Sequence, residues 1–272
     1  MKKIIYGNSN FRKIKINNNY LYIDKTDYIE KLEKLNDDFV IFLRPRRFGK
    51  SLFLSTLQYY YDENSADEFE AMFHDTYIGK NSTPLKNSYR ILFMEFSGIN
   101  TDAGIDTIYK EFRDNVNSAT HRYFASYGYD KYIDNLRKIK NPSELIKYFF
   151  DVVKDDKIYI LIDEYDHFAN AILAHNMQEF LKVVSKDGFV QSFYEILKGA
   201  TQIGTVQKMF ITGVTPITLD SLSSGFNIVK HITYKKEFNA LAGFTQEEVI
   251  YSLEQYLFRA VSYTHLTLPT KA

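Results

Sequence analysis

The chain has 272 residues with 34 basic and 34 acidic side chains, and 45% of its residues are hydrophobic, which is the composition of a globular protein that can bury a core. A formal net charge of zero gives no overall attraction to nucleic acid or to an anionic membrane. Because the chain has no cysteine, disulfides, thiolate metal sites and a cysteine nucleophile are excluded.

Residues 1–37 are predicted to form an N-terminal extension that packs on the core. Alternation in residues 11–16, an asparagine turn and the apolar run 20–23 predict a short β-hairpin. A short helix is expected next, with Thr26 or Asp27 as its N-cap residue.

From residue 38 to residue 260, short apolar strands alternate with helical patterns, and one domain is expected. Strands are predicted at residues 39–43, 89–96, 158–162, 208–214 and 228–234. Helices are predicted at residues 50–61, 62–74, 102–127, 130–139, 141–153 and 176–200, and loops at residues 77–88 and 221–227. Thr245 and Glu248 have the spacing of a capping box, which predicts one more helix. This alternation predicts a three-layer α/β fold with a mostly parallel sheet.

The strand at residues 39–43 leads through the loop Arg44-Pro-Arg-Arg-Phe-Gly into a helix that Lys50 and Ser51 open. Strand, loop, Gly-Lys-Ser and helix together are the context of a phosphate-binding loop. Gly49 lets the backbone approach a phosphate, Lys50 can reach the terminal phosphates, and the Ser51 hydroxyl can ligate Mg²⁺. Arg44 stands where the usual G-x-x-x-x-G-K-[ST] pattern has its first glycine, so a basic turn before a core helix explains this stretch equally well.

The strand at residues 158–162 ends in Asp163 and Glu164, at the edge of the sheet where ligands bind in open α/β folds. Asp163 is predicted to hold Mg²⁺, and Glu164 to orient or deprotonate an attacking water. Taken alone, a solvated strand end explains both residues. Two half-motifs in this order, each at the end of an apolar strand, predict a nucleotide site, and their spacing leaves room for a strand between the two.

Thr212 ends the predicted strand at 208–214, where a polar sensor would contact the γ-phosphate or the attacking water. A hydrogen-bonded threonine at a strand end explains the residue equally well. The predicted nucleotide ligands are Arg44, Pro45, Arg46, Arg47, Phe48, Gly49, Lys50, Ser51, Leu52 and Thr212.

The three arginines of the loop, Arg44, Arg46 and Arg47, admit three interpretations. They could stabilise transition-state charge, contact the phosphates of a nucleic acid, or pair with acidic neighbours such as Asp163 or Asp166. Nucleotide binding or structural pairing is favoured over nucleic acid, because no other basic cluster with interleaved aromatic residues is evident. His167 lacks a second ligand at metal-binding spacing and is interpreted as a surface or core histidine.

With both motifs in place, the sequence resembles the AAA-ATPase-like family of bacterial proteins over nearly all of residues 6–258. The resemblance rests on residues 11–14, 22–26, 44–51, 161–166, 210–217 and 243–249, and the loop RPRRFGKS is its sharpest part. An arginine in place of the first glycine looks like that family's own loop.

The resemblance implies a three-layer P-loop NTPase domain of the ASCE/AAA-like type that binds ATP and Mg²⁺. Lys50, Ser51, Asp163 and Glu164 would take the usual roles of these motifs. Members of the family often carry a C-terminal nuclease-like domain, which would follow the part of the chain seen here.

Residues 261–272 continue neither helix nor strand patterning and resemble a translated sequencing-adapter segment, so we expect a non-native tail on a truncated chain. The start of the chain is too short and polar for a signal peptide, and no apolar run approaches the roughly 18–20 residues of a membrane span. A cytoplasmic location without a membrane partner is therefore expected.

Three functions remain open from the sequence. The first is a Mg²⁺-dependent ATPase that drives conformational change in a homo-oligomer or an attached effector domain. The second is a nucleotide-gated module that hydrolyses little ATP and regulates a partner domain. Glu164 favours the first because a pure sensor needs no general base, whereas the missing first glycine leaves the second open. The third is a nucleic-acid-binding module that uses the arginine-rich loop.

Overall fold

A five-stranded sheet forms the middle layer of the structure, a computed structural model that describes residues 3–17, 19–100, 104–184, 188–216 and 226–264. Its strands are β3 (Phe39–Leu43), β4 (Arg90–Glu95), β5 (Ile158–Asp163), β6 (Val206–Gly213) and β7 (Lys230–His231). They lie in the order β4-β5-β6-β3-β7, and every neighbouring pair is parallel. The predicted parallel α/β architecture is confirmed.

Strand β6 lies between β3 and β5, the strands that precede the two halves of the predicted site. Leu43 pairs with Gly213, and Ile162 pairs with Ile211, so the carboxyl ends of the three strands meet at one edge of the sheet. The strand order therefore brings the loop after β3 and the carboxylates after β5 to the same edge, with the end of β6 between them.

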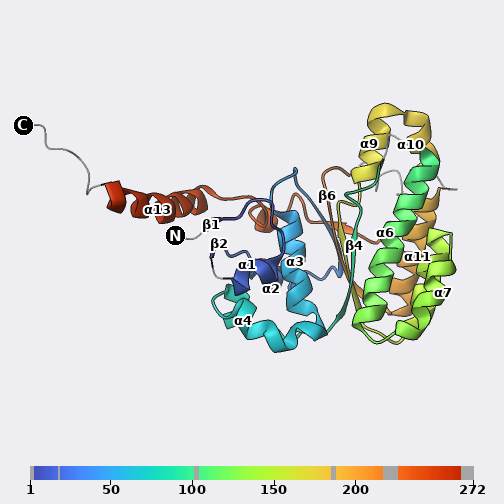
Figure 1. Cartoon of the computed structure of the whole chain (residues 1–272), viewed down its shortest axis with the longest axis horizontal. Coiled ribbons are helices and arrows are strands. Elements are labelled where there is room, and N and C mark those ends of the chain that lie inside the picture. Colours follow the sequence, from blue (N-terminus) through green and yellow to red (C-terminus); the bar gives the residue numbers. More distant parts are fainter. Residues whose placement is uncertain (1–2, 18, 101–103, 185–187, 217–225, 265–272) are drawn as a thin grey trace, which may run out of the picture.

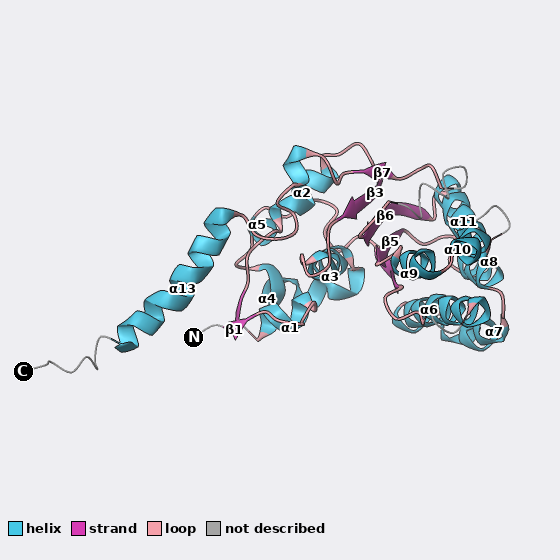
Figure 2. Cartoon of the chain, turned by 90° about the horizontal axis from the view of Figure 1, so that it is seen from above, coloured by secondary structure: helices cyan, strands magenta, loops and turns pink. Residues whose placement is uncertain are grey.

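Helices cover both faces of the sheet (Figures 1 and 2). One face carries α1 (Phe11–Ile16), α2 (Asp27–Glu33), α3 (Lys50–Tyr61), the 3₁₀ helix η1 (Glu63–Glu68), α4 (Phe69–Phe73) and α5 (Tyr77–Lys80). The other face carries α6 (Ile105–Ser126), η2 (Asp130–Tyr132), α7 (Ile133–Lys138), α8 (Pro142–Val152), α9 (His167–His175), α10 (Met177–Val184) and α11 (Phe189–Ile203). After β7 the chain forms η3 (Lys236–Phe238) and then α13 (Gln246–Thr264), which extends away from the sheet (Figure 2).

Strand β5 shows why the sheet is a buried middle layer. Ile158, Ile160 and Ile162 belong to the core on the α6 side, whereas Tyr159 and Leu161 belong to the core on the α3 side. Successive side chains of a strand point to opposite faces, so a strand that is apolar at every position has to be covered on both faces.

The N-terminal hairpin prediction is wrong. Residues Phe11–Ile16 form helix α1, and the short strands β1 (Lys3–Ile4) and β2 (Tyr20–Leu21) pair in parallel. The Asn10 side chain accepts a hydrogen bond from the Lys13 backbone N–H at 2.8 Å and caps the helix. Phe11 and Ile14 are its buried residues, packed in the core beside α3 and α4, and this burial overrides the alternation of the sequence.

Three further differences concern helices. Residues Tyr77–Lys80, predicted as loop, form α5, and α9 was not predicted. Helix α13 continues to Thr264, past the position where a break in the pattern was predicted, and residues 265–272 lie outside the described part. Most of the predicted loop 221–227 also lies outside it. Within the described residues, no helix combines the length and apolarity that a membrane span requires.

An aromatic cluster around Phe112 holds α6 against the sheet. The Phe112 ring is fully buried and stacks on Phe96 at 4.9 Å, with ring centroids of Phe168 at 5.5 Å and Phe193 at 5.2 Å. We predict that Phe112→Ala lowers the free energy of unfolding by about 3–5 kcal/mol, because it leaves a cavity among close-packed rings. Denaturant unfolding measures this loss.

The matched control for that experiment is Ile203→Ala on α11, where the side chain is 78% exposed. Its effect should stay within about 0.5 kcal/mol, as for most surface substitutions. Equal destabilisation by both variants would contradict the packing role assigned to Phe112.

Candidate functional site

The loop between β3 and α3 closes around the ammonium group of Lys50. Its Nζ donates hydrogen bonds to the backbone oxygens of Arg44 at 2.9 Å and Pro45 at 3.1 Å, and the residue is only 5% exposed. Burial lowers the pKa of Lys50, and the nearby carboxylates of Asp163, Glu164 and Asp166 oppose this shift. The loop is therefore folded around a buried cation.

The turn into α3 requires backbone conformations that most residues avoid. Gly49 has φ of 90° and precedes the first helical residue, Lys50. Arg47 also has a positive φ, of 68°. A non-glycine residue in this region is uncommon, and such conformations cluster at ligand-binding loops. The N–H groups at the start of α3 have no side-chain cap and are suited to an anion.

Arg44 braces the loop. Its guanidinium donates to the backbone oxygens of Leu43 at 3.1 Å and Thr233 at 3.0 Å, and to the Asn239 side chain at 3.2 Å. It also lies over the Phe42 ring, 4.8 Å from the centroid. These partners are carbonyls and a ring rather than the carboxylates considered from the sequence. Its predicted contact with nucleotide remains a prediction.

Asp163 and Thr212, at the ends of neighbouring strands, are joined directly. The Thr212 hydroxyl donates to Oδ1 of Asp163 at 2.6 Å, and the Glu164 backbone N–H donates to the same oxygen at 3.0 Å. Asp163 is 3% exposed and Thr212 is fully buried. The sensor position predicted for Thr212 thus lies beside the predicted metal ligand, where the threonine is already hydrogen-bonded.

The residues present fit a magnesium ion that arrives with a nucleotide. Among the described residues, both hydrogen bonds to the Asp163 carboxylate end on Oδ1, so Oδ2 is the oxygen left for a cation. No group of three or more His, Cys, Asp or Glu side chains in the described ranges could hold a metal alone. Mg²⁺ usually takes one or two carboxylates together with substrate phosphates and water, and Asp163 with the Ser51 hydroxyl supplies that donor chemistry.

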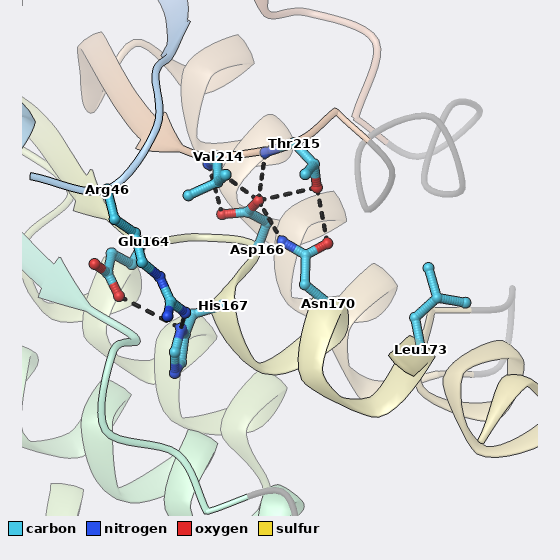
Figure 3. A pocket seen from close by; sticks show the side chains of 8 residues that line it. All are labelled: Arg46, Glu164, Asp166, His167, Asn170, Leu173, Val214 and Thr215. Atoms are coloured by element: carbon cyan, nitrogen blue, oxygen red, sulfur yellow. Dashed lines mark hydrogen bonds and ion pairs between the residues drawn. The ribbon is translucent and has the colours of Figure 1, made fainter. Parts of the chain in front are cut away.

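Glu164 directly follows Asp163 and has a left-handed backbone conformation, with φ of 51°. Its side chain is 24% exposed and borders a cavity of about 390 Å³ (Figure 3). The cavity is lined by Arg46, Glu164, Asp166, His167, Asn170, Leu173, Val214 and Thr215. A carboxylate at the border of such a cavity can accept a proton from a water or hydroxyl bound there.

Asp166 was considered only as a partner for the loop arginines, and the structure gives it another role. Its carboxylate, 1% exposed, accepts from the backbone N–H groups of Val214 at 3.1 Å and Thr215 at 2.7 Å, and from the Asn170 side chain at 2.6 Å (Figure 3). The Tyr165 hydroxyl donates to the Thr215 backbone oxygen at 2.6 Å. Residues 165 and 166 therefore clamp the segment that follows β6.

Gly213 is the sequence signal that could have revealed this clamp. A Cβ atom there would lie 2.5 Å from Oδ1 of Asp166 and 2.5 Å from the Tyr165 ring. The absence of a side chain at Gly213 leaves room for Asp166 and Tyr165.

His167 was set aside as a surface or core histidine, and the structure brings it to the cavity. Its Nδ1 lies 2.8 Å from Nη2 of Arg46 and 3.6 Å from Oε2 of Glu164 (Figure 3). Its place at the start of α9, shortly after Glu164 along the chain, is the one signal for this proximity.

We predict that Asp166→Ala lowers the free energy of unfolding by about 1–3 kcal/mol, because it leaves the partly buried backbone N–H groups of Val214 and Thr215 without their carboxylate acceptor. Denaturant unfolding measures the change. Asp155→Ala, at an exposed carboxylate, is the control and should have little effect. If Asp166→Ala and Asp155→Ala are equally stable, the bonds of Asp166 to the segment after β6 do not stabilise the fold.

Comparison with known proteins identifies the family of the chain. A family model described as "Predicted AAA-ATPase" matches residues 5–223. The chain is also similar to an uncharacterized protein in the vnfD 5′ region of Azotobacter chroococcum mcd 1, with 25% identity over 264 residues. That match covers 91% of this chain and 44% of the relative, so the chain spans less than half of the relative's length. Because the family model matches well over half of its residues, the chain belongs to the predicted AAA-ATPase family.

Proposed function

We propose that this domain binds ATP with Mg²⁺ and hydrolyses it to ADP and phosphate. The observation that carries the proposal is the meeting, at one edge of the sheet, of the Lys50 loop and the Asp163–Thr212 pair, with Glu164 beside them. These groups come from three adjacent parallel strands in the order that a site between them requires.

Each residue has a defined task in this proposal. The N–H groups at the start of α3 bind phosphate oxygens, and Lys50 exchanges its bonds to the loop carbonyls for bonds to the terminal phosphates. Ser51 and Asp163 would hold Mg²⁺, which supplies charge neutralisation at the phosphates. Glu164 orients the attacking water and accepts its proton. Thr212 holds Asp163 in place from the neighbouring strand.

The nucleic-acid alternative receives less support from the described contacts. The Arg44 guanidinium is used within the protein, so one of the three loop arginines is withdrawn from a phosphate-binding surface. A nucleotide-gated module with little hydrolysis uses the same binding groups as the ATPase, and turnover distinguishes the two. We further propose that the domain drives or regulates an attached effector domain in the cytoplasm, which the family resemblance implies to be nuclease-like.

We predict that Lys50→Ala weakens ATP binding by about 100-fold or more, because charge-assisted hydrogen bonds to the phosphates are lost. Isothermal titration with Mg-ATP measures this effect. Lys80→Ala, at an exposed lysine of α5, is the control and should bind like the wild type. If the Lys50 variant binds ATP as tightly as the wild type, or if a folded wild type does not bind ATP, the loop is only a basic turn before a core helix.

We predict that Glu164→Gln keeps ATP affinity within about threefold and lowers turnover by roughly 100- to 10,000-fold, the range for loss of a general base. Phosphate release under saturating Mg-ATP is the measurement, with Glu70→Gln as an exposed control. If both variants turn over like the wild type, Glu164 has no part in the reaction. Binding by the wild type without turnover would favour the regulatory module.

A further inference from the structure

The arginine-rich loop places its arginines in different surroundings. Arg44 is bonded to carbonyls beyond β7, and Arg47 is exposed on the turn with positive φ. Arg46 lines the cavity that Glu164 borders (Figure 3). Its position therefore links the phosphate-binding loop to the carboxylates that follow β5.

The contact between Arg46 and His167 fixes which ring nitrogen carries a lone pair. Arginine has only donors, so at 2.8 Å the Nδ1 of His167 must accept the hydrogen bond from Nη2. With Nδ1 occupied in this way, the Glu164 carboxylate at 3.6 Å from the same nitrogen receives no hydrogen bond from it. Within the described part of the chain, Arg46 forms no ion pair with a carboxylate. The Arg46 guanidinium therefore donates to a neutral imidazole and not to Glu164, so the Glu164 carboxylate can act as a base.

Arg46 and Lys50 lie close to each other, and the positive charge of Arg46 contributes to the lowered pKa of Lys50. The Lys50 ammonium is bound by the backbone oxygens of Arg44 and Pro45, which immediately precede Arg46. In phosphoryl transfer the γ-phosphate lies between the lysine of the loop and the group that positions the attacking water. Arg46 follows Arg44 and Pro45 in the loop, and its side chain lines the same cavity as Glu164 (Figure 3).

We propose that Arg46 is a ligand of the γ-phosphate supplied by the loop itself, and that His167 is its resting partner in the empty site. His167 acts as a positioning residue, because it keeps the guanidinium from pairing with Glu164. The inference rests on the proposed ATPase function and adds to it a means of distinguishing ATP from ADP. An exposed guanidinium on a neutral acceptor can leave for a phosphate more readily than one paired with a carboxylate.

Binding of two nucleotides tests the role of Arg46 without any turnover. Arg46→Ala should lower affinity for Mg-ATPγS by about tenfold or more and leave affinity for Mg-ADP within about twofold, because the lost contact goes to the γ-phosphate. Arg46→Lys should recover part of the loss, since it keeps the charge without the planar donor geometry. Arg137→Ala, at an exposed arginine of α7, is the control and should change neither affinity.

A double-mutant cycle tests His167 as a residue that acts through Arg46. His167→Ala should lower turnover about tenfold in the wild type, because the guanidinium then pairs with Glu164, and should have no effect in the Arg46→Ala background. His167→Gln supplies a carbonyl acceptor and should restore most of the turnover. An equal fall in both backgrounds would overturn the assignment of His167.

The outcomes separate this inference from the proposed function. Nucleotide binding with an unchanged ATPγS-to-ADP affinity ratio in Arg46→Ala overturns the inference alone. A folded wild type that binds neither nucleotide overturns the proposed function and the inference with it. A wild type that binds without turnover still tests Arg46 through the affinity ratio, and the lack of turnover then overturns the role of His167 as a partner in catalysis.

Discussion

The hydrogen bond from Thr212 to Asp163 is the contact on which the candidate site depends. It is 2.6 Å long, lies away from water and joins the end of β6 to the end of β5. A charged acceptor in such surroundings makes a strong hydrogen bond. One residue further along β6, the Gly213 backbone oxygen accepts from the Arg44 N–H at 3.2 Å. Thus β6 fixes the end of β5 and the loop between β3 and α3 relative to each other.

The bonds between β5 and β6 also support an unfavourable backbone conformation at Glu164. Its φ of 51° is unfavourable for a residue with a side chain, and it persists because both neighbours are fixed. Its own N–H bonds to Asp163, the Tyr165 N–H donates to the Thr212 oxygen at 3.1 Å, and Asp166 holds the segment after β6. The clamp and the strand-end bond together direct this carboxylate toward the cavity.

The sequence predicts the parts of the site that depend on local pattern. Strand ends, Gly-Lys-Ser and the capping box can be recognised because each residue set is contiguous, and Thr245 and Glu248 do bond each other's backbone N–H groups. Arg44 bonds the side chain of Asn239, and Arg46 bonds His167. Both partners lie far from the loop along the chain, so no local pattern indicates these contacts. The wrong prediction for residues Phe11–Ile16 has the same cause, since the burial of this helix depends on contacts with α3 and α4.

The two halves of the site are connected to different parts of the fold. The loop between β3 and α3 is held from beyond β7, where the Gly243 N–H donates to the Phe48 oxygen at 2.7 Å, shortly before α13. The Glu164 side is braced by Asp166, which lies directly before α9 in the opposite helical layer. ATP and ADP share the phosphates that the loop would bind and differ at the γ-position near Glu164. On the proposed function, occupancy of the loop would therefore act on the segment leading to α13, and the identity of the nucleotide would act on the α9 side.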